Sequence, residues 1–150
     1  MIILVFSDSH GDSESMRKVM KRFYPHAAMY LGDGIEDFFS LEKEFPLTEF
    51  IHVRGNEDAA DASDEERLHV AEEVSVYMNH FKMVERAVEL NAQIALYGNS
   101  HTPELFVKDG ITFMNPGSIS KEFGFQTFGM IEAFEGEYLC KVMFSDLLVL

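Results

Sequence analysis

Ile2-Ile3-Leu4-Val5-Phe6-Ser7-Asp8-Ser9-His10-Gly11 is the most informative part of the chain. Its apolar run, residues 2–5, has the length and composition of a fully buried strand. Asp8 and His10 then fall at the C-terminal end of that strand, where open α/β sheets bind their ligands. A carboxylate and an imidazole at this spacing are candidate metal ligands. A turn in which Asp8 and Ser9 hydrogen-bond the local backbone is the alternative explanation of the same residues.

A strongly periodic helix is expected after this strand. Apolar residues recur at helical spacing from Met16 to Phe23, and we expect Ser13 to cap the helix and Pro25 to stop it. The next predicted elements are a strand at 27–31, a helix with Phe38, Leu41 and Phe45 on one face that closes at Pro46, and a strand at 49–53. This βαβαβ order predicts parallel strands whose C-terminal ends share one edge of a sheet.

The second half of the chain is predicted to consist mostly of strands and turns. Asp109-Gly110 is a good signal for a hairpin turn, and we also expect tight turns at 71–73 and 135–137. The predicted elements are strands at 67–70, 74–78, 93–97, 104–107, 111–114, 126–134 and 138–144, with one helix near residues 84–91. Taken together, the elements predict an α/β fold in which two sheets form a β-sandwich flanked by helices.

The composition restricts the classes of function. A chain of 150 residues with 47% hydrophobic content fits one domain spanning residues 1–150. Its apolar runs are far shorter than the ~20 residues that span a bilayer, and no signal sequence is recognisable, so we expect a soluble, cytoplasmic protein without a membrane partner. Cys140 is the sole cysteine, which excludes an internal disulfide. The net charge of −14 disfavours extended binding to nucleic acid phosphates.

Polar residues able to bind metal follow five predicted strands. In chain order these residues are Asp8 with His10, Asp33, Asn56, His80, and Asn99 with His101. Any one of them alone could satisfy backbone groups in a turn. Their succession, Asp-x-His, Gly-Asp-Gly, Gly-Asn-x-Asp, a lone His and Gly-x-x-His, resembles the calcineurin-like metallophosphoesterase superfamily. From end to end, the chain is most similar to the small single-domain phosphodiesterase branch of that superfamily.

The resemblance implies a four-layer α/β/β/α fold and a metal centre with a specific ligand set. In that set, Asp8, His10 and His101 hold one ion, Asn56 and His80 hold a second, Asp33 bridges both, and Asn99 lies at a further ligand position of the second ion. Mixed oxygen and imidazole ligation favours Mn²⁺, Fe, Zn²⁺ or Ni²⁺ over Ca²⁺, and we expect two divalent transition metals with Mn²⁺ foremost.

The activity implied by the resemblance is metal-dependent hydrolysis of small phosphodiesters or phosphomonoesters. Two ions ~3.5–4 Å apart can bind both the attacking and the leaving oxygen of an in-line displacement. The implied nucleophile is a metal-bridging hydroxide, so no serine or cysteine nucleophile is needed. Ser118, in Asn-Pro-Gly-Ser, resembles the family's loop near the metals, although a plain turn explains it equally well.

Three positions depart from the family pattern. Asn99 stands where the family usually has a histidine ligand, and an amide is a weaker donor for these metals. Glu57 stands where other members have His or Cys, the former proposed to protonate the leaving group. Glu57 could act as a general acid only if burial or the neighbouring Asp58 raised its pKa, and a surface carboxylate is the alternative. The segment His80-Phe81-Lys82 replaces the usual His-Gly-His.

These departures leave alternatives to a two-metal enzyme. One is a non-catalytic scaffold on the same fold, as in the retromer subunit that resembles this family; others are a single-metal protein and a plain α/β domain. Scaffold use predicts an exposed apolar patch, for which the candidates are Phe123, Phe125, Phe128 and Leu147-Leu148-Val149-Leu150. The apolar C-terminal end is also a candidate strand for pairing in a homo-oligomer.

Overall fold

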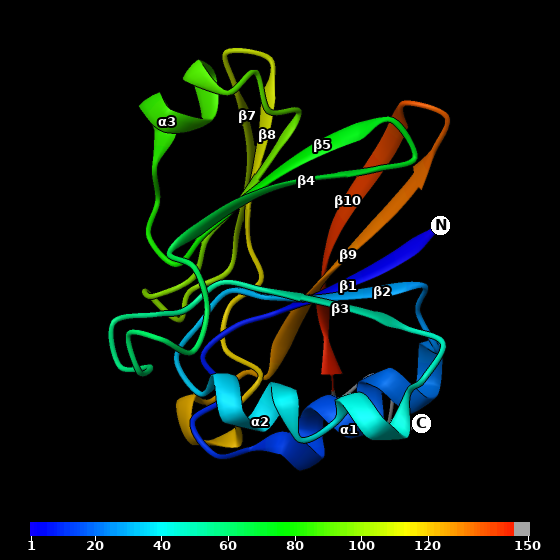
Figure 1. Cartoon of the computed structure of the whole chain (residues 1–150), viewed down its shortest axis with the longest axis vertical. Helices are drawn as coiled ribbons and strands as arrows, with labels where there is room; N and C mark the ends of the chain where they lie inside the picture. Colours follow the sequence, from blue (N-terminus) through cyan, green and yellow to red (C-terminus); the bar gives the residue numbers. More distant parts are fainter. Residues whose placement is uncertain (146–150) are drawn as a thin grey trace.

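Two five-stranded sheets pack face to face in the computed structural model, which describes residues 1–145 (Figure 1). The strands of the first sheet are β1 (Ile2–Phe6), β2 (Ala27–Tyr30), β3 (Glu49–His52), β9 (Thr127–Phe134) and β10 (Glu137–Phe144), in the order β10-β9-β1-β2-β3. The strands of the second sheet are β4 (Glu66–Ala71), β5 (Val74–Asn79), β6 (Ile94–Leu96), β7 (Glu104–Lys108) and β8 (Ile111–Asn115), in the order β4-β5-β6-β8-β7.

Helices cover the outer faces of both sheets. The helices α1 (Ser13–Phe23) and α2 (Ile35–Phe39) lie against the first sheet, and α3 (Val84–Glu89) lies against the second (Figure 1). Two 3-10 helices, η1 (Glu42–Glu44) and η2 (Lys121–Phe123), complete the described elements. This arrangement confirms the predicted α/β fold, a two-sheet sandwich in four α/β/β/α layers.

The opening strand β1 is buried on both of its faces. Ile3 and Val5 contribute to the core between the two sheets, whereas Leu4 and Phe6 pack in the core under α1 and α2. Because successive side chains of a strand point to opposite faces, burial on both sides requires a continuous apolar run. β1 pairs in parallel with β2, and β2 pairs in parallel with β3, as the βαβαβ order predicts.

The first helix begins one residue earlier than predicted, because Asp12 and not Ser13 is its cap. The Asp12 carboxylate accepts the backbone N–H of Ser15 at 3.0 Å and the Ser15 hydroxyl at 2.8 Å. Ser13 is instead the first helical residue. The helix ends at Tyr24, which adopts φ +42° immediately before Pro25.

The second helix was predicted to continue to Pro46, and this was wrong. The α-helical part ends at Phe39, where the Ser40 hydroxyl donates to the carbonyl of Asp37 at 2.7 Å. Serine competes with the helical backbone in this way, and a separate 3-10 helix follows. Leu41 and Phe45 are nevertheless buried with Phe38 in one core, so the predicted apolar face is present although the helix is interrupted.

The predicted tight turns are present. The central residues Glu72 and Glu73, and likewise Asp109 and Gly110, have positive φ, as two-residue hairpin turns require. The third turn has the same property at positions 135 and 136. Ala71 and Glu137 belong to the flanking strands and not to the turns.

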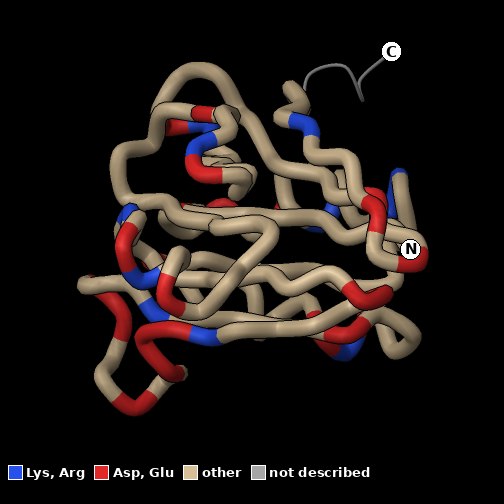
Figure 2. Tube along the Cα trace, turned by 90° about the horizontal axis from the view of Figure 1, so that it is seen from above, with Lys and Arg blue, Asp and Glu red and all other residues tan. Residues whose placement is uncertain are grey.

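The predicted apolar patch is not formed as expected. Phe128 is fully buried, because β9 directs it into the core beneath α1, where its ring centroid lies 6.1 Å from that of Phe6. Phe123 and Phe125 are exposed, and residues 147–150 lie outside the described part of the chain. Acidic segments outnumber basic ones over the surface, as Figure 2 shows. Among residues 1–145, no helix is long and apolar enough to cross a membrane.

Candidate metal centre

Four loops bring histidine and aspartate side chains together at the C-terminal ends of β1, β2, β5 and β6. Two groups result, Asp8 with His10 and His101, and Asp8 with Asp33 and His80. In each group the potential ligand atoms all lie within 4.8 Å of one another, and Asp8 belongs to both. Residues separated by more than 90 positions in the sequence therefore share one site.

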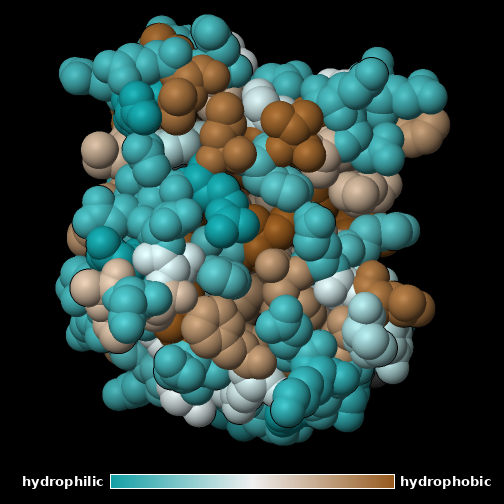
Figure 3. Space-filling view, in the orientation of Figure 1, coloured by the Kyte–Doolittle hydropathy of each residue, from teal (hydrophilic) through white to brown (hydrophobic). Residues whose placement is uncertain are grey.

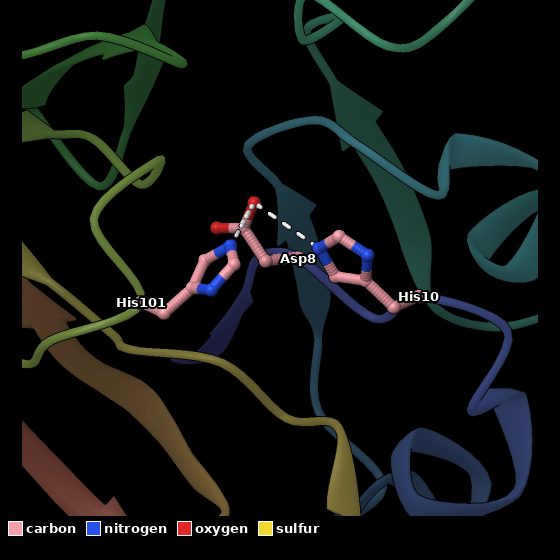
Figure 4. Close-up of side chains that lie close together, drawn as sticks. All are labelled: Asp8, His10 and His101. Atoms are coloured by element: carbon pink, nitrogen blue, oxygen red, sulfur yellow. Dashed lines mark ion pairs between the residues drawn. The ribbon is translucent and has the colours of Figure 1, made fainter. Parts of the chain in front are cut away.

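Asp8 lies between the imidazoles of His10 and His101 (Figure 4). Its Oδ1 atom is 3.4 Å from Nε2 of His101 and 4.0 Å from Nε2 of His10. The other oxygen, Oδ2, accepts the Ser7 hydroxyl at 2.6 Å and the backbone N–H of Asn99 at 3.2 Å. These two hydrogen bonds hold the carboxylate so that Oδ1 faces the two rings.

His80 is fixed with one ring nitrogen toward Asp33. Its Nδ1 atom lies 2.7 Å from the carbonyl oxygen of Leu31, which can only accept, so Nδ1 carries the proton and donates. In the neutral ring, Nε2 then presents a lone pair 3.1 Å from Oδ2 of Asp33. A backbone carbonyl that sets the tautomer in this way is the usual support of a metal-bound histidine.

Buried polar atoms without hydrogen-bond partners concentrate at this site. Among residues 1–145 there are five such side-chain atoms, and three of them are Asp8 Oδ1, His10 Nε2 and His80 Nε2. Leaving a buried polar atom unpaired costs roughly 1–3 kcal/mol. A divalent cation would give all three atoms a partner, and carboxylate oxygen with imidazole nitrogen is a donor set that such cations accept. The residues present therefore fit a metal.

The backbone is strained at several residues of the candidate site. Five candidate site residues have positive φ, namely Asp8 (+52°), His10 (+44°), Asp33 (+63°), Asn99 (+68°) and His101 (+64°). Positive φ in a residue other than glycine is uncommon, although Asp, Asn and His tolerate it best, and it costs of order 1–3 kcal/mol. Such strain clusters at functional sites, where the surrounding structure enforces it.

Two carboxylates that the sequence analysis did not assign brace the site loops. Asp58 accepts the backbone N–H groups of residues 33, 34, 35 and 55 at 2.7–3.1 Å. Asp37 accepts the Ser9 hydroxyl at 2.6 Å and the backbone N–H of Gly11 at 2.8 Å. Asp58 is the last residue of the Gly-Asn-x-Asp motif, which was the available signal for it. The only sequence feature that pointed to Asp37 is its place in the first turn of a helix.

Close packing around the aspartates depends on small and buried residues. A Cβ atom on Gly55 would lie 2.1 Å from Oδ1 of Asp33, so no larger residue fits there. Ser118 is buried and donates its hydroxyl to the Asp8 carbonyl at 2.8 Å. Burial raises the pKa of Tyr30, whose protonated hydroxyl donates to the Asp33 carbonyl at 2.5 Å.

Three further predicted site residues, Asn56, Asn99 and Glu57, have exposed side chains. Asn56 is exposed, and its side chain makes no hydrogen bond to any residue in the described range 1–145. Asn99 is also exposed and reaches Asp8 through its backbone N–H. Glu57 is exposed as well, and its backbone N–H donates to Oδ1 of Asp33 at 2.8 Å. Burial, one of the two conditions under which Glu57 could act as a general acid, is not met, because its side chain is exposed.

Comparison with known proteins identifies the family. The model of the calcineurin-like phosphoesterase superfamily domain matches residues 1–135. The probable metallophosphoesterase YsnB of Bacillus subtilis (strain 168) is 30% identical over 130 residues, which cover 79% of this chain and 75% of that protein. The chain therefore belongs to the calcineurin-like phosphoesterase superfamily, whose members use divalent metal cofactors.

Solved structures agree with this assignment. A crystal structure of a Streptococcus pneumoniae TIGR4 protein, described as a predicted phosphoesterase, has a TM-score of 0.78 at 26% identity and covers 97% of this chain and 90% of its own. A crystal structure of Vps29 from Entamoeba histolytica, complexed with Zn²⁺, has a TM-score of 0.72 at 17% identity and covers 97% of this chain and 99% of its own. The second likeness concerns the fold alone.

Proposed function

We propose that this member of the superfamily is a metal-dependent phosphoesterase that hydrolyses small phosphodiesters or phosphomonoesters. The observation that carries the proposal is the convergence of unpartnered, buried ligand atoms on Asp8, His10 and His80. A plain α/β domain has no physical reason to keep these atoms unpaired, or to keep the backbone of Asp8 and His10 strained. Binding of divalent metal ions would account for both features, because the ions would be the partners of the unpaired atoms.

We assign Asp8, His10 and His101 to one ion and Asp33 with His80 to a second, with Asn56 and Asn99 beside the second. Bound divalent ions polarise a phosphoryl oxygen as Lewis acids and lower the pKa of a bound water. The chain itself supplies the orientation. Asp8 Oδ1 is held toward two imidazoles by hydrogen bonds to Oδ2, and Leu31 keeps the His80 lone pair directed at Asp33.

The net charge makes the cations necessary for binding as well as for chemistry. With 26 acidic and 12 basic residues, the protein repels an anionic phosphate ester at long range. Two divalent ions at the site would reverse the sign of the local field. A small phosphate ester can then approach, whereas an extended nucleic acid still meets the net negative charge of the rest of the protein.

Metal reloading tests the proposal. The protein is stripped with a chelator, reloaded with Mn²⁺, Zn²⁺, Ni²⁺ or Fe²⁺, and assayed on p-nitrophenyl phosphate and bis(p-nitrophenyl) phosphate. We expect metal-dependent turnover, with Mn²⁺ the most effective ion, that falls at least a hundredfold in Asp33→Asn. His69→Ala is the matched control, because His69 pairs with Glu49 on the strands and lies outside both ligand groups. Turnover no higher than that of Asp33→Asn would overturn the proposal.

A second candidate function is a scaffold or single-metal protein, and the exposed side chain of Asn99 favours it. A chain with one tight ion would lack the two-ion clamp. Figure 3 shows one face of the molecule, where apolar side chains lie in separate groups among hydrophilic ones and do not form one continuous docking surface. Metal analysis after dialysis separates the candidates: two ions per chain favour the phosphoesterase, one ion favours the single-metal protein, and none favours the scaffold. If one ion is found, Asn99→His should add a second and raise turnover.

A further inference from the structure

A cavity of about 270 Å³ opens directly beside the candidate metal centre. Its lining includes Asn56, which neighbours the Asp33 loop, and Phe81, which follows His80 in the chain. The cavity therefore shares a wall with the second group of potential ligands. The proposed catalytic function uses none of its other lining residues.

The wall of the cavity nearest His80 is apolar, and contacts with neighbouring side chains fix the position of its aromatic ring. Phe81 and Met83 are each 44% exposed. The Phe81 ring packs edge-on against His80, with the ring centroids 5.1 Å apart at an angle of 83°. The side chain of Asn79 accepts the Phe81 backbone N–H at 2.9 Å, which fixes the loop. An aromatic ring and a thioether together form a good contact surface for a planar group.

The charge of the cavity excludes a second phosphate as its preferred occupant. Arg54 and Glu65 are the charged lining residues, and Nη2 of Arg54 lies 3.0 Å from Oε1 of Glu65. Glu65 compensates the charge of Arg54, although Nε of Arg54 is buried and has no hydrogen-bond partner among residues 1–145, so the cavity offers no second cation to an anion. An uncharged occupant leaves this pair intact.

We infer that this cavity is the subsite for one ester group of the substrate and that it selects a planar, uncharged group such as an aryl ring or a nucleoside base. The inference rests on the proposed function, because the phosphoryl group must lie at the metal ligands for its ester arm to pass Asn56 and reach Phe81. Phe81 and Met83 are then specificity-determining residues.

Symmetric, slowly hydrolysed phosphodiesters test the subsite, because either ester arm can enter it. Diphenyl phosphate and diethyl phosphate carry the same charge, and their ester groups differ in planarity, size and hydrophobicity; the Phe81 variants separate a specific contact with the ring from general hydrophobicity. We expect calorimetric titration of the Zn²⁺-loaded protein to give at least tenfold tighter binding of diphenyl phosphate. Phe81→Ala should reduce this ratio to below threefold, and Phe81→Leu to an intermediate value. Phe134→Ala should preserve it, since Phe134 is an exposed phenylalanine that lines a different cavity beside Met1.

A spectroscopic reading locates the bound ester group. In protein labelled with ¹³C at the methionine methyl groups, the Met83 resonance, assigned with Met83→Leu, should shift on addition of diphenyl phosphate and stay in place with diethyl phosphate. Equal affinities for the two ligands, an unchanged ratio in Phe81→Ala, or an unmoved Met83 resonance would each overturn the subsite. Failure of the proposed function is seen separately, as the absence of metal-dependent turnover of bis(p-nitrophenyl) phosphate in the wild-type chain.

Discussion

Oδ2 of Asp58 lies 2.7 Å from the backbone nitrogen of Asp33 and accepts its N–H. The same carboxylate accepts N–H groups from Gly34, Ile35 and Gly55, so it ties the loop after β2 to the loop after β3. One side chain thus satisfies four backbone donors and holds the strained backbone of Asp33 in place. Asp58 is a positioning residue for the centre, and no ion need touch it.

Replacing Asp58 should destabilise the protein and loosen the site. A hydrogen bond to a charged group contributes about 1.5–3 kcal/mol, and such contributions are not additive at one side chain, so Asp58→Ala should lower the free energy of unfolding by at least about 2 kcal/mol. Asp58→Asn should not rescue it, because each carboxylate oxygen accepts two N–H groups and an amide NH₂ would face donors. Urea denaturation measures the loss. Asp61→Asn, an exposed change in the same loop, is the control and should stay within about 0.5 kcal/mol of wild type.

Asn99 should contribute to stability through its backbone alone. It adopts φ +68°, and its N–H donates to Asp8. Glycine accepts this conformation without strain, whereas alanine loses about 1–2 kcal/mol in it. Asn99→Gly should therefore be more stable than Asn99→Ala by about 1 kcal/mol, measured by thermal denaturation of the metal-free protein. Equal stabilities of the two variants would contradict a contribution from the positive φ of this residue.

The sequence predicted the fold, and it pointed to five residues that the structure brings together, because both predictions depend on local patterns. The buried run of β1, the polar residues at strand ends and the hairpin turns are each visible within a few positions. Asp37 and Asp58 were missed as supports because their carboxylates fold back onto backbone donors, and even the Gly-Asn-x-Asp motif that contains Asp58 does not show which donors it meets. The predicted exposure of Phe128 failed for a similar reason. Its burial depends on the register of β9 against β1, which brings it under α1.

Asp12 joins α1 to the loop that carries Phe123, and its removal should show a specific pH dependence. Burial alone would raise the pKa of Asp12, but hydrogen bonds from the Ser15 hydroxyl and from the backbone N–H groups of Lys121 and Ser15 outweigh burial and lower it from 3.8. A carboxyl with a lowered folded-state pKa stabilises the fold above its unfolded value and loses that effect as pH falls through the folded value. Asp12→Ala should lower the free energy of unfolding by about 1–2 kcal/mol at pH 7, and by much less at pH 2.

Asparagine is the matched control at this position, since it is an equally good helix cap but does not titrate. Asp12→Asn should lose less stability than Asp12→Ala at pH 7 and should show a flatter acid profile than the wild-type chain below pH 4. Parallel profiles for the wild type and both variants would contradict this account of Asp12.

Cys140 should react slowly in the folded protein. Burial raises the pKa of its thiol from 9.0 to about 12, so the reactive thiolate is scarce at pH 8. We expect iodoacetamide to alkylate the native protein at least tenfold more slowly than the urea-unfolded chain. Because the pKa of the thiol is higher in the folded protein than in the unfolded chain, the protonated thiol contributes to the free energy of unfolding below pH 9. This contribution is lost as the pH rises toward 12. Alkylation at equal rates in the two states would show that the thiol is accessible in the folded protein and that its pKa is not raised there.

Metal binding should stabilise the fold through the histidines that face Asp8. A ligand that binds only the folded state at a hundred times its dissociation constant adds about 2.7 kcal/mol to the free energy of unfolding. Mn²⁺ or Zn²⁺ should therefore raise the melting temperature of the chelator-treated protein by several degrees. His101→Ala removes the ring nitrogen that lies 3.4 Å from Asp8 Oδ1 and should abolish most of this rise. His69→Ala should keep the full shift, because His69 lies outside both groups of potential ligands. A wild-type melting temperature that changes with neither ion would contradict a metal centre at Asp8.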